Sequence, residues 1–223
     1  MPTTSLDALT SDQVNRKMWV AAPWRWAIVP LTSISLSDTN QDFALSNSDL
    51  YRLIRARITR TDSTPDESHP LNVLEWLEPA LNYVQGMYGI QACSMVATTT
   101  TMRLDTAISV PSGVTIQIDG EYQTVPTKIT ATSSTITFND EYAETAIEGL
   151  KWAYMVLAKD PRAGGMAVNS KGDKTYSGQY AVFMASIEDM KQAEDFGNGE
   201  NYRFPDDSLG VGRYTSGNPF GWG

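Results

Sequence analysis

The side chains that most often carry out catalysis are scarce in this sequence. His69 is the only histidine and Cys93 the only cysteine among 223 residues. A serine or cysteine nucleophile needs a neighbouring base, and the one imidazole ends a polar stretch, residues 60–69, that reads as a solvated loop. Glu75 and Glu78 share one turn of a predicted helix, but the pattern supplies neither a cleft nor a second acidic pair. The sequence therefore predicts a protein that is not an enzyme.

Metal and phosphate sites are not indicated either. A structural zinc site needs clustered cysteine and histidine ligands, and one residue of each type cannot provide them. The acidic groups at 62–67, 140–141 and 206–207 fit a loop, a helix start and a tail. The glycines at 164–165 and 210–212 lack the strand before and the helix after that a phosphate-binding loop requires. We expect no cofactor and no metal.

Charge and hydropathy narrow the class of partner. There are 26 acidic against 17 basic residues, a net charge of -9, which argues against binding nucleic acid by neutralising phosphates. An acidic surface is compatible with DNA that passes without adhering. No apolar run approaches the roughly 18 residues of a membrane helix, and the first ten residues do not resemble a signal peptide. A single cysteine suits a reducing cytoplasm.

Apolar spacing predicts helices at about 5–22, 70–82, 139–160 and 176–195. The longest of them, 139–160, has the clearest pattern: five apolar residues recur in it at intervals of three and four. We expect that stripe to be its buried face: Ala143, Ile147, Leu150, Tyr154 and Leu157. Trp152 and Val156 widen its apolar surface, and we expect these two side chains to contact a neighbouring subunit. The last helix carries Tyr180, Phe183, Ile187 and Met190 on one face.

Period-two patterns predict a β region at about 27–59 and 90–138. Residues 50–59 alternate, with Arg55 and Arg57 on the wetter face, where contact with another subunit is the favoured interpretation. Asp119-Gly120 predicts a two-residue hairpin turn. The fold class predicted from these elements is α+β: a helical bundle of two long and one or two shorter helices with a small antiparallel β domain. These parts form one domain, residues 1–195.

The last 28 residues differ in composition from the rest. They contain seven glycines and two prolines, which disfavour regular structure. They also hold six aromatic residues, which disordered tails usually lack: Phe196, Tyr202, Phe204, Tyr214, Phe220 and Trp222. Either this extended C-terminal arm, residues 196–223, folds back on its own domain, or it orders on a partner. The aromatic anchors favour a partner. The loop at 161–177 is long enough to be a functional arm or a mobile segment.

The order of these elements resembles a known family. A helix ends in PWRW (23–26), followed by QDFAL (41–45), YRLIRARI (51–58), PLNVLEWLEPAL (70–81) and VTIQIDGEYQTVP (114–126). The helices DEYAETAIEGLKWAYMVLAKD (140–160) and YAVFMASIEDMKQAE (180–194) complete the set. Over about residues 8–195 the chain is similar to the head-to-tail adaptor (connector) proteins of short-tailed bacteriophages. The PWRW corner and the DEYAETAIEGL helix entrance carry the likeness most strongly.

The resemblance implies a virion structural protein at the head-tail junction, assembled in the host cytoplasm. Twelve copies would form a ring adaptor between the portal and the tail, complete the head after DNA packaging and line the DNA channel. It further implies that the C-terminal arm binds the portal protein, that a tail or nozzle protein lies below, and that genomic DNA passes without sequence-specific binding. No membrane partner is expected. The alternative is a phage decoration protein, or a receptor-binding or glycan-binding tail protein whose β region holds the ligand.

Overall fold

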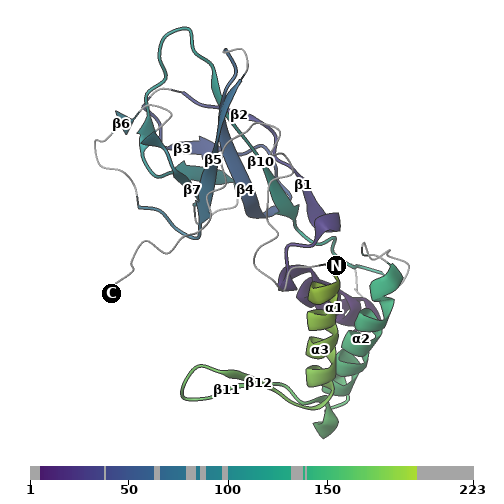
Figure 1. Ribbon diagram of the computed structural model, residues 1–223. Coiled ribbons are helices and arrows are strands. Elements are labelled where there is room, and N and C mark those ends of the chain that lie inside the picture. The colour runs from purple at the N-terminus through teal and green to yellow at the C-terminus, as the bar shows by residue number, and fades with distance from the viewer. Residues whose placement is uncertain are drawn as a thin grey trace.

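The chain folds into a helical lobe and a larger, curled β-sheet that lie one above the other in Figure 1. The structure, a computed structural model, describes residues 6–37, 39–62, 66–78, 84–85, 89–96, 100–131, 138 and 140–194. Each lobe has its own hydrophobic core.

The helical lobe consists of three α-helices in the described part of the chain. They are α1 (Leu6–Ala21), α2 (Ala143–Leu157) and α3 (Gly178–Ala193). Short 3-10 turns flank them: η1 (Arg25–Ala27), η3 (Asp140–Tyr142) and η4 (Pro161–Ala163). Helices thus occupy three of the four predicted ranges. In α3 the predicted face is the inner one, with Phe183, Ile187 and Met190 buried and Tyr180 packed against the core.

The described residues contain twelve strands. They are β1 (Ile28–Pro30), β2 (Ile34–Ser35), β3 (Asp42–Ala44), β4 (Leu50–Arg60), β5 (Glu67–Leu74), β6 (Val84–Gln85), β7 (Ala92–Met95), β8 (Thr101–Leu104), β9 (Ala107–Ile108), β10 (Ile116–Thr124), β11 (Met166–Val168) and β12 (Lys174–Tyr176). Eight of these form one sheet in the order β1-β10-β4-β5-β7-β8-β3, with β2 also paired to β10. The pair β5–β7 is parallel, so the sheet is mixed.

The predicted fold class, a helical bundle with a small antiparallel β domain, is wrong. The sheet is the dominant element, and three helices stand beside it in the described residues. Part of the error lies at the predicted helix 70–82. Residues 67–74 form β5 instead, with His69 opposite Ile58 and Leu71 opposite Ala56. Hydrogen bonding to β4 on one side and β7 on the other outweighs an apolar spacing that a short helix would also produce.

The predicted hairpin at Asp119-Gly120 is also wrong. Both residues lie inside β10, which runs unbroken beside β4. Gly120 has another purpose: a Cβ there would collide with the carbonyl oxygen of Arg55 and stand 3.2 Å from the Cα of Ala56. The glycine allows close approach of two strands rather than a turn.

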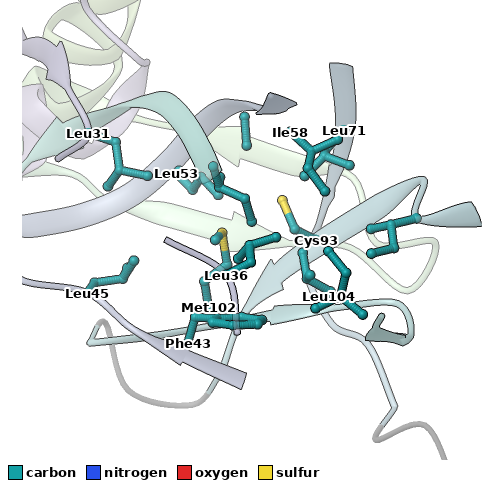
Figure 2. Packing of buried hydrophobic residues seen from close by; sticks show 14 of the residues in the cluster. Leu31, Leu36, Phe43, Leu45, Leu53, Ile58, Leu71, Cys93, Met102 and Leu104 are labelled. Carbon is teal, nitrogen blue, oxygen red and sulfur yellow. The ribbon is translucent and has the colours of Figure 1, made fainter. Parts of the chain in front are cut away.

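The core of the sheet joins strands that are distant in sequence. Figure 2 shows side chains from β3, β4, β5 and β8, among them Phe43, Ile58, Leu71 and Met102, converging around Cys93 on β7. Burial raises the pKa of the Cys93 thiol to about 12. Because the thiolate is the reactive form, this cysteine is a core residue and not a nucleophile.

The core of the helical lobe depends on a close crossing at Gly149. A Cβ at this position would lie 2.5 Å from Cγ1 of Val14 on α1 and 2.8 Å from Cε2 of Phe183 on α3. Small residues dominate the inward face of α2 around it: Thr145, Ala146, Gly149 and Ala153, with Trp152 as the one large member. Small side chains here let three helices meet at one point.

The two lobes are joined by hydrogen bonds between α1 and residues 123–129. The side chain of Gln123 is fully buried, and its Nε2 donates to the carbonyls of Trp19 (2.9 Å) and Ala22 (3.0 Å). Its Oε1 accepts from Nε of Arg52 at 2.6 Å. The last turn of α1 has no basic residue, so Gln123 satisfies carbonyls that the helix end leaves unpaired.

Tryptophans of the PWRW sequence fill the corner where α1 meets the sheet. Trp24 is completely buried and donates from Nε1 to the carbonyl of Met18 at 2.7 Å. Trp26 stacks on it with ring centroids 6.1 Å apart, and Trp19 meets Trp26 edge-on at 4.9 Å. Trp19 also donates from Nε1 to the carbonyl of Thr124 on β10 at 2.6 Å.

Replacing Gln123 by leucine should destabilise the protein by about 1–3 kcal/mol, because buried carbonyls and the Arg52 guanidinium lose their partner. Urea unfolding followed by tryptophan fluorescence measures the effect. Gln117→Leu, on the half-exposed part of the same strand, is the matched control and should change stability little. Equal effects from both variants would contradict the capping role of Gln123.

Replacing Gly149 by valine should cost about 1–3 kcal/mol, since the new side chain overlaps Val14 and Phe183. Gly165→Val is the control, because no atom lies within 4 Å of a Cβ there. Thermal unfolding by circular dichroism compares the two. A Gly149→Val protein as stable as the control would contradict the close crossing.

Candidate interaction surfaces

Within the described residues, the side chains considered for catalysis lie on different elements or in a core. His69 lies on β5, half-buried, and Cys93 lies in the core of the sheet. Glu75 and Glu78 follow β5 in a segment that is not helical, so no helix turn pairs them. Across the described ranges, no three His, Cys, Asp or Glu side chains are grouped so as to hold a metal ion.

Several acidic side chains instead form local ion pairs. Asp42 on β3 binds Arg103 on β8 through two hydrogen bonds of 2.7 Å, and this guanidinium lowers the pKa of the Asp42 carboxyl. Asp62 is held by Arg60 in the same way, at 2.8 and 3.0 Å. These acids connect neighbouring strands and loops.

Arg55 and Arg57 share one face of β4, as predicted. Arg55 forms an ion pair within the fold: its Nη2 lies 2.5 Å from Oε2 of Glu121 on β10. Arg57 is exposed beside Asp119. Both arginines line a shallow cavity of about 400 Å³ with Ser33, whose hydroxyl donates to Asp119 at 2.5 Å. Arg57 is the member of the pair whose charge faces outward.

The predicted buried stripe of α2 faces outward. Ala143 is exposed, Ile147, Tyr154 and Leu157 are 49%, 43% and 45% exposed, and Leu150 is half-buried. Only the hydroxyl of Tyr154 has a described polar partner, Asp7 on α1, to which it donates at 2.8 Å. We call these five residues the outer stripe. The periodicity is genuine, but the small residues around Gly149 occupy the inner face, so the large apolar side chains lie outside.

The two α2 residues predicted at a subunit contact differ in their placement. Trp152 is only 8% exposed, and its ring lies 5.0 Å from Tyr180 and 6.1 Å from Phe183, with Nζ of Lys17 5.1 Å above it. This burial corrects its assignment to a subunit surface. Val156, near the end of α2, is 46% exposed and stays available for contact.

The segment between α2 and α3 forms an antiparallel hairpin, β11–β12, that projects from the end of the helices (Figure 1). Every residue in its two strands is exposed, including Met166, Val168 and Tyr176. At its tip, Oδ1 of Asn169 accepts from the backbone N–H groups of Lys171 and Asp173, both at 2.9 Å. The hairpin replaces the loop predicted at 161–177. Its alternating apolar residues around Asn, Gly and Asp are the sequence signal for it.

The base of the hairpin is tightly constrained. Gly164 and Gly178 have φ of 66° and 59°, and a Cβ on either would collide with the backbone of the opposite arm. Close to them in sequence, the carboxylate of Asp160 accepts two hydrogen bonds from Arg162, one from Nη2 at 2.7 Å and one from the backbone N–H of Arg162 at 2.9 Å. These bonds lower the pKa of Asp160 to about 2. The hairpin therefore leaves the helical lobe at a defined angle.

A second cavity, of about 800 Å³, lies between α1 and the ends of β4 and β10. Its lining combines apolar residues such as Val20, Val125 and Pro126 with the cations Arg16, Lys17 and Lys128. Tyr51 borders it and is 37% exposed. The cavity is open and of mixed polarity.

The predicted portal-binding arm, from Phe196 to Trp222, lies outside the described residues. No protein-family model and no curated protein matches the chain. Within the described residues, no helix is both long and apolar enough to cross a bilayer.

A charge on the inner face of α2 should destabilise the fold more than a charge on the outer stripe. The stripe periodicity alone predicts the reverse. Trp152→Asp should destabilise the protein by about 3–5 kcal/mol, because a packed aromatic ring is lost. Ile147→Asp should cost less than about 1 kcal/mol, since that side chain is half-exposed. Far-UV circular dichroism during urea titration measures both. Greater damage from Ile147→Asp would contradict the orientation of α2.

Proposed function

We propose that this protein is a bacteriophage adaptor: a structural subunit that forms a ring between the portal and the tail. In this role it completes the head after DNA packaging and lines the channel through which the genome leaves. The sequence likeness carried by the PWRW corner and by the DEYAETAIEGL entrance of α2 supports the family, and with it a twelve-fold ring.

The observation that carries the proposal is the exposure of two separate apolar surfaces on the helical lobe. One is the outer stripe of α2, and the other is the hairpin with Met166, Val168 and Tyr176. Soluble monomers rarely leave large apolar side chains grouped in water. A ring subunit needs two different contact surfaces, one for each neighbour, because its interface is heterologous.

The charge of the chain supports the same role. A net charge of -9 gives a ring of many copies a strongly negative surface. A negative channel repels the DNA backbone, so the genome can pass without binding to the wall. In this proposal the protein binds no DNA sequence and has no catalytic function.

A second candidate function is favoured by one observation. The sheet is larger than predicted, and the cavity of about 800 Å³ opens beside two of its strands. A decoration protein, or a tail protein that binds a receptor or a glycan, would use such a β surface with Tyr51 at its border. The cavity supplies several polar and charged side chains, among them Asp49 and Lys128, but a single aromatic ring, that of Tyr51, on which a sugar could stack.

Removing the C-terminal arm separates the two functions. A chain that ends at residue 195 should keep the circular dichroism spectrum and melting temperature of the full chain but lose binding to the portal protein. Co-sedimentation and electron microscopy of the protein mixed with portal rings measure the loss. A receptor-binding module would keep its ligand without the arm.

A milder variant tests whether the aromatic side chains are the anchors. Replacing all six aromatic residues of the arm by serine should abolish portal binding as completely as deleting residues 196–223, because aromatic anchors dominate such contacts. Serine at Asn201, Asp207 and Asn218, in the same arm, is the control and should retain binding. Portal binding by the truncated chain would overturn the role proposed for the arm.

A further inference from the structure

We infer that the hairpin β11–β12 of one copy docks on the outer stripe of α2 in the next copy. The inference rests on the proposed ring and names the two surfaces that meet in it. The occupant of the stripe is thus a second copy of this chain.

The hairpin has two chemically different faces. Residues directly opposite each other in an antiparallel pair share a face, and the register pairs Met166 with Tyr176 and Val168 with Lys174. Ala167 and Thr175 form the other face. One side of the hairpin is therefore apolar, with one lysine, and the other is small and polar.

The apolar face of the hairpin is about half exposed. Met166 and Val168 are 52% and 55% exposed, and Tyr176 is 40% exposed with its ring against that of Tyr180, 5.7 Å between centroids. A two-stranded hairpin is at best marginally stable in water without a surface to pack on. Its tip turn and glycine base are nevertheless well formed, which suits an arm held ready for a partner.

The hairpin leaves the helical lobe near one end of the outer stripe. The hairpin projects away from the helices in Figure 1. It begins directly after α2 and η4, so it leaves the lobe at the end of α2 where Tyr154 and Leu157 are exposed. The inferred contact therefore joins the hairpin of one copy to the Tyr154 and Leu157 end of the stripe in the next copy.

Charge favours a second copy as the partner. The hairpin exposes Lys171 and Lys174 and one carboxylate, that of Asp173, which accepts a hydrogen bond from Nδ2 of Asn169 at 2.8 Å. Two lysines and one aspartate give the hairpin a net charge of +1, in a chain whose net charge is -9. Such a projection is attracted to another acidic copy, while acidic surfaces elsewhere on the two copies repel.

The test is the self-association of full-length variants, measured by analytical ultracentrifugation over a range of concentrations. Val168→Asp on the apolar face and Leu157→Asp on the stripe should each weaken association roughly a hundredfold, because each places a carboxylate where apolar side chains would meet. Thr175→Asp adds the same charge to the opposite face of the hairpin and should associate like the wild type. All three positions are exposed, and circular dichroism verifies that the variants fold.

Mixing the two defective variants gives a sharper result. The Leu157→Asp chain keeps its hairpin and the Val168→Asp chain keeps its stripe, so together they can form one intact interface. The mixture should contain a one-to-one dimer, although neither variant associates alone.

Three results would overturn the inference: wild-type chain that stays monomeric, Val168→Asp that associates normally, or Thr175→Asp that fails equally. None of them decides whether the arm binds the portal, which the truncation experiment measures separately. Suppose that the chain ending at residue 195 fails to bind the portal while Val168→Asp associates normally. These two results together would reject the hairpin interface and leave the proposed adaptor function standing.

Discussion

The buried amide of Gln123 is the contact on which the arrangement of the two lobes depends. The sheet and the helices have separate hydrophobic cores, so neither core by itself orients the other. Gln123 lies on β10, between β1 and β4, satisfies two carbonyls at the end of α1 and accepts from Arg52 on the adjacent β4. A polar side chain with all of these partners specifies direction as well as proximity, which apolar contact alone does not. Trp19 and Trp24 then exclude water from the same corner.

Local sequence signals were sufficient for three of the four predicted helices but not for the sheet. Three helical ranges, the inner face of α3 and the tryptophan corner follow from periodicity and from residue type. The strand β5 does not, because its pairing with β7 depends on residues about twenty positions away. Asp119-Gly120 has the chemistry of a turn, yet the close approach of β4 uses the glycine within a strand. Long-range strand pairing overrides such local preferences.

For the interaction surfaces, the sequence identified the apolar stripe of α2 but not its direction. Hydrophobic periodicity shows that Ile147, Tyr154 and Leu157 share a face, and both a core and a partner surface produce that pattern. The deciding residue is Gly149, because helices pack most closely where a side chain is absent. Trp152 illustrates the converse: a large ring outside the stripe lies in the core, because it covers the gap beside Tyr180 and Phe183.

The two glycines at the base of the hairpin have a consequence for assembly. Backbones that cross without room for a Cβ leave little freedom to pivot, so Gly164 and Gly178 hold the arm at one angle to α3. In a closed ring, the rotation from one subunit to the next equals a full turn divided by the number of subunits. If the arm is the link between neighbours, its angle sets that rotation. The size of the ring is then encoded in a crossing of two residues that carry no side chains.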